Sequence, residues 1–563
     1  MLKTQSSRDT WIFWLIALTV LGAGLGLRDP WPADEPRFAL VAKQMIESGD
    51  WLFPHRGNEL YSDKPPLFMW LQASAYTLVR EWRIAFLLPS LLAALGTLWC
   101  VIDLGRRLWT RRVGLYAGWL LLLTLQFTYQ AKKAQIDPVV VFWITLANYG
   151  LLRHFLRGPD WRMWTLGWFA AGLGTITKGV GGLALLMLLP AAFAALRGWP
   201  RVRVPVRDWR FWLGPLALLF AVSLWLVPML GTALAHPDPA YRDYVNDILF
   251  NQTAKRYTRS WDHAQPPWYH LGVMLTMWLP PMLALPWALP AWRRRLQRRD
   301  ARYLLPLAWW LLVVVFFSFP SGKRDVYIMP ALPMACLALA PLLPGLLRKL
   351  SAQRLAFAFA ALIAVAAIGL GGALLGVPDL AEKLMARRGM DYQDVRGLAY
   401  LLLAIGLWLA GALAWFRPSR GVKGMLVGLV GLWTLFAVVG YPLLNPSGSA
   451  REVMTRAGQI IGPDAELGLV VWREQIKFQA DRPVQTFGFG KEEHWGVKWE
   501  VQWRDGIAWM RAAPQRRWLF VLGSSMPPCV RRQHAIRVGI ANRREWWLVP
   551  MAAVPAGCPV ATP

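Results

Sequence analysis

Apolar runs close to 20 residues long recur along most of this chain, and they constrain its fold more than any other feature. A helix of that length crosses the ~30 Å hydrocarbon core of a bilayer. The composition agrees, because 56% of the 563 residues are hydrophobic and 35 are tryptophans. The expected spans are residues 11–27, 84–102, 113–129, 138–152, 163–177, 180–196, 211–231, 268–291, 303–319, 327–346, 355–377, 398–416 and 425–441. The sequence thus predicts a polytopic α-helical membrane protein with about thirteen transmembrane helices.

The first apolar run is expected to stay in the mature protein. Lys3 and Arg8 precede it, as cations precede the apolar part of a signal peptide. No small-residue cleavage site follows the run, however. We therefore interpret it as a retained first span.

The formal net charge of +29 could reflect binding of nucleic acid or contact with an anionic membrane. The positions of the arginines distinguish these two explanations, because the arginines lie in short loops between apolar runs instead of on one continuous face. That arrangement is typical of orientation bias in a membrane and speaks against nucleic-acid binding.

The basic loops alternate along the chain, which predicts the topology. The rich set reads "GRRLWTRR", "RHFLRGPDWR", "RGWPRVRVPVRDWR", "WRRRLQRRDAR", "LRKLSAQR" and "RPSRGVKG". The positive-inside rule places these loops and the N-terminus in the cytoplasm. An odd number of spans then puts the C-terminus on the opposite side. In a Gram-negative bacterium this means an inner-membrane protein with a periplasmic C-terminal segment.

The first outer loop, residues 28–83, carries two helical patterns. "EPRFALVAKQMIESG" has apolar residues at helical spacing and Gly49 where a C-cap is expected, and "PPLFMWLQASAYTLV" begins with two prolines. Such helices could lie flat on the outer membrane surface or pack against their own bundle. The sequence favours neither.

Composition changes after Tyr441. We expect residues 1–441 to form the membrane domain and residues 442–563 a small α/β domain, with strands at "ELGLVVW", "PVQTFGF", "RRWLFVLG" and "AIRVGI" and helices at "AREVMTRAGQIIG" and "KWEVQWRDGIAWMRAA". Cys529 and Cys558 would share an oxidising compartment there, which predicts a disulfide. Cys100 and Cys336 fall in apolar runs and are expected to be inert core residues.

Motifs of the common soluble enzymes are missing from the sequence: it has no GxSxG, Walker A or HExxH. "GLGTITKGVGG" resembles a phosphate loop, but Lys178 is followed by Gly179 and not by Ser or Thr. Any chemistry must therefore come from residues that the fold brings together.

Ionisable residues gather at the outer ends of the expected spans. Charges at membrane depth are costly and usually functional, so these residues predict one polar cavity roofed by the C-terminal domain. They are Asp34, Glu35, Arg37, Tyr61, Asp63, Lys64, Asp137, Lys178, Arg256, His263, Lys323, Arg324 and Tyr327.

Simpler structural roles stay open for individual members. Asp34 could cap a helix beginning at Pro36, and Glu35 could interact with that helix dipole. Asp137 before Pro138 could cap the fourth span. The cations Arg37, Lys64 and Lys323 could each snorkel to the membrane interface. His263 could be an ordinary loop histidine.

The cavity's chemistry suits a lipid-borne phosphate beside a carboxylate. Arginine and lysine at membrane level would bind the phosphate, and the carboxylate would activate or position a reactant. No cofactor is required by the sequence. A divalent cation held by Asp63 and His263 is compatible with it, although no ligand spacing compels one.

Several stretches together resemble a known family. "PADEPRFALVAKQMIESGDWLFP", "YSDKPPLFMWL", "QIDPVVVFW", "TKG", "NQTAKRYTRSWDHAQPPWYH" and "SGKRDVYIMPALP" occur in order between about residues 30 and 335. They are similar to the signature stretches of the membrane-embedded GT-C glycosyltransferases. The resemblance is closest to the bacterial 4-amino-4-deoxy-L-arabinose lipid A transferases, which are related to protein O-mannosyltransferases.

This resemblance implies inverting transfer of a sugar from undecaprenyl phosphate to a lipid A phosphate at the periplasmic face. It implies that Asp34 is the essential first-loop carboxylate and that Arg37, Lys64 and Arg256 surround the donor phosphate. Positions that would line the cavity are Tyr61, Asp137, Lys178, His263 and Tyr327. Its partners would be the lipid-linked donor, the acceptor and membrane lipids.

One motif departs from the family pattern. The lipid A branch is expected to read Glu-Lys-Pro, whereas this chain has Asp63-Lys64-Pro65-Pro66. Transfer of another polyprenyl-linked sugar, such as galacturonate, hexosamine or mannose, and transfer to a protein therefore stay open, as does a lipid-linked sugar flippase. Asp34 would act as a general base on a hydroxyl acceptor, but would position a phosphate acceptor or stabilise an oxocarbenium-like transition state.

Overall fold

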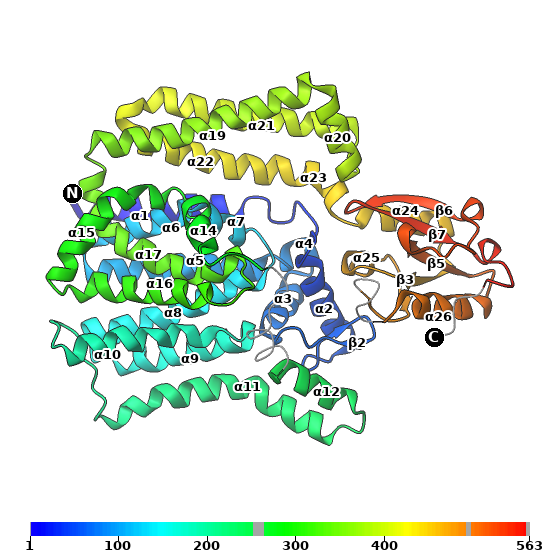
Figure 1. Cartoon of the computed structure of the whole chain (residues 1–563), viewed down its shortest axis with the longest axis horizontal. Coiled ribbons are helices and arrows are strands. Elements are labelled where there is room, and N and C mark those ends of the chain that lie inside the picture. The colour runs from blue at the N-terminus through cyan, green and yellow to red at the C-terminus, as the bar shows by residue number, and fades with distance from the viewer. Residues whose placement is uncertain (1, 251–263, 491–496, 559–563) are drawn as a thin grey trace.

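The computed structural model describes residues 2–250, 264–490 and 497–558, and helices dominate it. Most helices run along the long axis of the molecule, and a small domain containing a sheet lies at one end (Figure 1). Within the described ranges, eight helices are long and apolar enough to cross a membrane, or nine if a bent pair forms one span. The chain is a multi-pass membrane protein.

Nine of the expected spans coincide with these helices and the bent pair. The single-helix spans are α8 (Ile136–Arg157), α16 (Ala301–Ser318), α19 (Leu350–Gly376) and α21 (Tyr392–Phe416). The spans that include shorter helical pieces are Trp82–Leu108 with α5 (Leu88–Leu108), Trp209–Ala235 with α11 (Leu213–Ala235), Asp325–Leu346 with α17 (Leu332–Leu339) and α18 (Leu343–Leu346), and Pro418–Gly448 with α22 (Gly421–Leu435) and α23 (Tyr441–Gly448). The bent pair is α14 (Tyr269–Met277) and Pro281–Gln297, which ends in α15 (Leu285–Gln297).

The other four expected spans coincide with helices that are too short or too polar to qualify by length and composition. They are α1 (Leu2–Gly22), α6 with α7 (Arg111–Leu123 and Leu125–Ala131), α9 (Trp161–Lys178) and η1 with α10 (Gly181–Met187 and Leu188–Leu196). Thr124 separates α6 from α7 because its backbone is extended (ψ 124°). The count of thirteen spans therefore stays a prediction.

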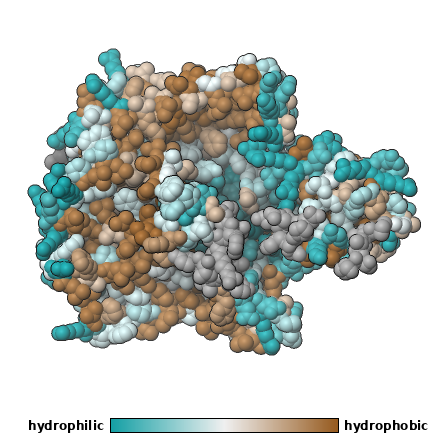
Figure 2. Space-filling view, viewed as in Figure 1, coloured by the Kyte–Doolittle hydropathy of each residue, from teal (hydrophilic) through white to brown (hydrophobic). Residues whose placement is uncertain are grey.

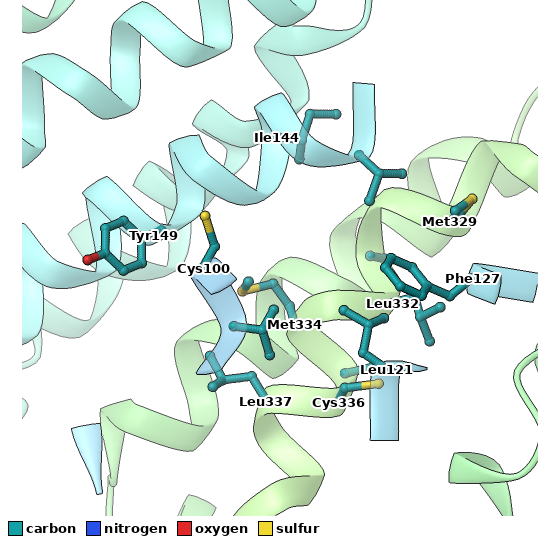
Figure 3. Packing of buried hydrophobic residues seen from close by; sticks show 14 of the residues in the cluster. Cys100, Leu121, Phe127, Ile144, Tyr149, Met329, Leu332, Met334, Cys336 and Leu337 are labelled. Atoms are coloured by element: carbon teal, nitrogen blue, oxygen red, sulfur yellow. The ribbon is translucent and has the colours of Figure 1, made fainter. Parts of the chain in front are cut away.

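The largest hydrophobic core lies among α5, α6, α8, α16 and α17 in the centre of the bundle. Figure 3 shows part of it, where Leu121, Ile144, Met334 and the two free cysteines lie close together. Cys100 and Cys336 are both buried, as expected for inert core residues. Helices α19, α21 and α22 have a separate core of their own and form a layer along one side of the bundle (Figure 1).

The first loop folds into α2 (Glu35–Ser48), a hairpin of β1 (His55–Arg56) and β2 (Glu59–Leu60), and α3 (Leu67–Val79). Gly49 ends α2 in the left-handed conformation (φ 74°), as its position predicts. The short helix α4 (Trp82–Ala85) then leads into α5.

Helix α2 is packed between two cores instead of lying on a membrane surface. Phe38 and Val41 belong to the core of the bundle, whereas Ala39 and Leu40 belong to the core of the C-terminal domain. Of the two positions that the sequence left open, packing against the protein is therefore the one observed for α2. The helix buries so much surface because the C-terminal domain covers its second face.

The C-terminal part contains a five-stranded mixed sheet with the order β4-β3-β5-β7-β6. The strands are β3 (Glu466–Val470), β4 (Val484–Thr486), β5 (Arg517–Leu522), β6 (Ile536–Ala541) and β7 (Arg544–Val549). Helices α24 (Arg451–Ile461), α25 (Glu474–Phe478) and α26 (Trp499–Arg511) accompany them. The sequence predicted four of these strands and two of these helices but missed β7 and α25. A disulfide joins Cys529 and Cys558.

The surface of the molecule reflects this division. Figure 2 shows hydrophobic residues over much of the helical part, with hydrophilic residues along the end away from the small domain and over the small domain itself. A hydrophobic belt between two polar ends is the surface that a bilayer requires.

Candidate functional site

Asp34 stands directly before the first turn of α2, in the N-cap position. Its side chain makes no capping hydrogen bond. Instead one carboxylate oxygen accepts a hydrogen bond from Arg37 at 2.5 Å, and the other accepts one from Gln135 at 3.1 Å. Asp34 therefore occupies the N-cap position, but its carboxylate does not cap the helix.

Three cations set the charge state of this carboxylate. Burial raises the pKa of Asp34, but Arg37, Arg324 and Lys178 lower it by more, so the pKa lies below the usual value. Arg324 Nη2 lies 3.7 Å from the second carboxylate oxygen. Asp34 is therefore an ionised group of low basicity held among positive charges.

Asp63 lies on the other side of Arg37. Its Oδ2 is 3.9 Å from Arg37 Nη1 and 3.6 Å from Arg56 Nη1. Arg56 comes from the hairpin and stacks on Phe489 of the C-terminal domain, 3.9 Å from the ring centroid. The C-terminal domain thus helps to position the charges of the first loop.

Tyr61 is fully buried beside these groups, with a side chain 1% exposed. Burial raises the pKa of its hydroxyl, which stays protonated. Among the described residues, no group forms a hydrogen bond with this hydroxyl. A buried donor without a partner is costly, so the hydroxyl is available to a bound ligand.

A second ion pair joins two other segments of the site. Lys178 at the end of α9 bonds to Asp137 in the first turn of α8. The N-cap of α8 is Gln135, so Asp137 is not its cap. The ring of Tyr327 lies 5.5 Å from Lys178 Nζ. Because the charge of Lys178 also lowers the pKa of Asp34, both ion pairs belong to one site.

Glu35 does not belong to this group of charges around Asp34. Arg28 donates two hydrogen bonds to its carboxylate, at 2.5 and 2.7 Å, and the backbone N–H groups of Trp31 and Ala134 donate two more. The residue is only 4% exposed. Its expected place among substrate-binding residues does not agree with this structure, because all of its acceptor capacity is used inside the protein.

Lys323 also differs from its expected role in the cavity. Its Nζ donates to the backbone carbonyls of Gln265 (3.0 Å) and Pro320 (2.6 Å), and the residue is 3% exposed. Lys323 thereby ties two loops together, and its neighbour Arg324 is the residue that faces Asp34.

Lys64 lies partly buried between Asp63 and the start of α3. Arg256 and His263 lie outside the described residues. Within the part of the chain that the structure describes, no group of three or more His, Cys, Asp or Glu side chains could hold a metal ion. Asp63 is instead neutralised by two arginines, and a metal at Asp63 and His263 stays an untested prediction.

Three features of this site had no distinct signal in the sequence. Gln135 precedes Asp137 by two residues, but its side chain is neutral, and the sequence pattern pointed only to ionisable residues. Arg56 sits in a loop whose hairpin the sequence did not predict. The unpartnered state of the Tyr61 hydroxyl depends on packing alone.

The geometry fits an anionic ligand that meets a carboxylate of low basicity. Arg37, Arg324 and Lys178 supply positive charge within one site, and preorganised charge of this kind stabilises negative charge that develops on a reacting group. The carboxylate itself suits positioning or stabilisation of positive charge better than proton abstraction.

Known proteins with similar sequences and folds were found. A family model described as dolichyl-phosphate-mannose-protein mannosyltransferase matches residues 63–227. An undecaprenyl phosphate-alpha-4-amino-4-deoxy-L-arabinose arabinosyl transferase of Pseudomonas aeruginosa (strain UCBPP-PA14) is 32% identical over 452 residues, which cover 78% of this chain and 77% of the relative. A protein of the same name from Pectobacterium carotovorum is 30% identical over 76% of this chain and is covered to 74%.

Solved structures agree on the fold. The crystal structure of ArnT from Cupriavidus metallidurans bound to undecaprenyl phosphate has a TM-score of 0.72 to this chain, over 98% of this chain and 99% of that one. The two sequences are 18% identical, so this likeness shows a common GT-C fold and no more. The same protein in the apo state gives the same TM-score.

Proposed function

The chain belongs to the family of undecaprenyl phosphate-α-4-amino-4-deoxy-L-arabinose arabinosyl transferases, and from this premise we propose that it moves 4-amino-4-deoxy-L-arabinose from undecaprenyl phosphate to a phosphate of lipid A. The observation that carries the proposal is the ionised Asp34 among Arg37, Arg324 and Lys178. That site suits two phosphate-bearing reactants and does not require a strong base.

The reaction balances without a cofactor. An oxygen of the acceptor phosphate attacks the anomeric carbon and forms a new C–O bond. The bond between that carbon and the oxygen of undecaprenyl phosphate breaks, so the lipid leaves as its phosphate with the bonding electron pair. Attack opposite the leaving group inverts the anomeric configuration.

The acceptor decides what Asp34 does. A phosphate monoester is already anionic near neutral pH, so no proton needs to be removed before attack. An ionised carboxylate can instead stabilise the positive charge that grows on the sugar in an oxocarbenium-like transition state. It can also orient the sugar's ammonium group. The lowered pKa of Asp34 keeps it in the form that both roles require.

The cations have the complementary task. Arg37, Lys64 and Arg256 would hold the donor phosphate and stabilise the charge that it gains on departure. The Tyr61 hydroxyl, buried beside Arg37, would donate to the same phosphate or to the sugar. Arg324, Lys178, Asp137 and Tyr327 would then face the acceptor.

The distribution of basic loops supports a periplasmic site in the inner membrane. The arginine-rich loops follow α5, α8, α10, α15, α18 and α21. By the positive-inside rule these ends are cytoplasmic, so Asp34 and the domain of residues 442–563 would face the periplasm. A donor whose tail stays in the bilayer can reach a site at that level.

A second candidate is transfer of a sugar to a protein hydroxyl. The match to the protein mannosyltransferase model and the Asp63-Lys64-Pro65-Pro66 motif favour it. A hydroxyl acceptor needs a general base, however, and the low basicity of Asp34 argues against one at this position.

Lipid A from cells that lack their own aminoarabinose transferase tests the proposal. Expression of this chain should add the mass of one aminopentose residue to lipid A, and expression of an Asp34→Asn variant to the same membrane level should not. Unmodified lipid A in cells that make the donor and the folded wild-type protein would overturn it. Sugar appearing on a periplasmic protein instead would establish the second candidate.

A further inference from the structure

A narrow apolar groove lies between the layer of α19, α21 and α22 and the central bundle. Its volume is about 250 Å³. The lining side chains come from both sides of the seam and include Trp119, Leu123, Pro281, Leu347, Leu355 and Met425. None of the residues around Asp34 lines it, so the groove is separate from the site already described.

The groove extends over part of one leaflet of a bilayer. On α6 its lining begins at Tyr116, one turn after Arg112, and extends to Leu123. From Tyr116 to Leu123 the helix rises ~10 Å. This is about a third of the ~30 Å hydrocarbon core. The groove therefore has room for the first part of an acyl chain that enters from the arginine-rich end.

Four cations adjoin the lining residues at the arginine-rich end of the groove. Arg348 and Lys349 directly follow the lining residue Leu347, Lys423 directly follows Val422, and Arg112 stands one turn below Tyr116. All four are exposed. The ion pairs found among the described residues leave these four cations without a carboxylate partner.

We propose that this groove is a binding site for an anionic glycerophospholipid of the cytoplasmic leaflet. The first part of one acyl chain would fill the groove, and the phosphate would lie among Arg348, Lys349 and their neighbours. Basic pockets between transmembrane helices on this side of a membrane bind acidic lipid head groups in general. A zwitterionic lipid would satisfy the groove but not the net positive charge at its entrance.

The donor's polyprenyl tail is a weaker fit for the same space. Its phosphate must lie near Asp34, toward the opposite membrane face, so a tail in the groove would leave the cations unpaired. A phospholipid accounts for both the apolar lining and the charges. It would also fill the seam between two separately packed cores and so hold the outer layer to the bundle.

Native mass spectrometry of the full chain in detergent, with phosphatidylglycerol or phosphatidylethanolamine added, tests the proposal. Wild-type protein should retain phosphatidylglycerol at least ~5-fold more than phosphatidylethanolamine. The double variant Arg348→Gln/Lys349→Gln should lose this preference, and Ala352→Phe, which fills the groove, should lower retention of both lipids. The matched control Arg203→Gln/Arg207→Gln removes two cations of another basic loop and should behave as wild type.

A thermal shift gives a second readout that needs no variant. Phosphatidylglycerol should raise the melting temperature of wild-type protein more than phosphatidylethanolamine does. Equal retention of the two lipids, or retention unchanged by both groove variants, would overturn the proposal. So would displacement of the retained phospholipid by undecaprenyl phosphate in direct competition. None of these results depends on transferase activity, so failure here leaves the proposed function intact.

Discussion

Asp34 shows how little of a residue's role follows from its place in a helix. It occupies an N-cap position, where aspartate usually accepts hydrogen bonds from the first turn. Here its carboxylate turns to Arg37 and Gln135 instead. The three-residue spacing of Asp34 and Arg37 brings them together even though α2 begins only at Glu35. The N-cap residue Asp34 and Arg37 in the first turn of α2 thus form one ion pair at the start of the helix.

The pH profile of transfer should report the charge around Asp34. The charge of Arg324 helps to hold the pKa of Asp34 below its usual value, so Arg324→Gln raises that pKa. More Asp34 is then protonated at a given acid pH, and the acid limb of kcat/KM should move to higher pH. Arg324→Lys keeps the charge and serves as the control. An acid limb that does not move in Arg324→Gln would separate Asp34 ionisation from turnover.

At the scale of elements, α2 connects three parts of the protein. Its sides pack in two different cores, and Glu35 in its first turn is bonded to Arg28 and to the backbone of Ala134 before α8. Arg28 also donates to the carbonyl of Lys132. This buried ion pair fixes the start of α2, and with it Asp34, against the loop that carries Gln135.

Loss of the Glu35 charge should destabilise the fold strongly. Glu35→Gln leaves the Arg28 guanidinium buried without its counterion, which costs ~3–5 kcal/mol. Glu47→Gln on the same helix is the matched control. It removes a pair with Lys43 at 3.8 Å that is partly exposed and worth ~1 kcal/mol or less. Chemical unfolding in detergent measures both variants, and equal stability of Glu35→Gln and wild type would contradict this role.

The sequence predicted the bounds of helices better than what those helices pack against. Apolar spacing and Gly49 defined α2 closely, because local preference and periodicity act within a few residues. The same pattern could not say whether its apolar stripe faces lipid or protein, since that depends on a domain about 400 residues further along the chain. Likewise Lys323 and Arg324 are adjacent cations that the sequence does not distinguish. Only the fold shows that Lys323 binds backbone carbonyls and that Arg324 faces Asp34.

At the scale of the whole molecule, Asp29 holds the helical part and the C-terminal domain together. This fully buried carboxylate bonds to Arg83 before α5, Asn445 in α23 and Arg451 in α24. Burial raises the pKa of Asp29, but the hydrogen bonds from these partners lower it by more. The pKa of Asp29 therefore lies well below the usual range. Asp29 lies only five residues before Asp34, so its bond to Arg451 also fixes the first loop against the C-terminal domain.

Loss of the bond between Asp29 and Arg451 should loosen the C-terminal domain. Arg451→Ala removes the ion pair between Asp29 and α24, and amide hydrogen exchange in α24 and around Asp29 should accelerate by ~10-fold or more. Arg456→Ala, an exposed change on the same helix, should leave exchange near the wild-type rate. Unchanged protection in Arg451→Ala would show that the apolar contacts of α2 suffice to hold the domain.

Most of the residues around Asp34 could be anticipated because they are charged and recur at the same ends of different spans. Asp137 and Lys178 come from separate helices, yet their shared membrane level already indicated a common cavity. Neutral or locally hidden contacts such as Gln135 could not be found in this way. Their contribution depends on distances that only the folded chain defines.

Transfer by purified protein in proteoliposomes tests the central claim most directly. The wild-type chain should convert undecaprenyl phosphate-linked aminoarabinose and lipid A into equal amounts of glycosylated lipid A and free undecaprenyl phosphate. Asp34→Asn, which removes the charge but keeps the shape, should lower kcat by ~10²-fold or more while the protein stays folded. Wild-type turnover by Asp34→Asn, or no transfer by folded wild-type protein with both substrates present, would contradict the account.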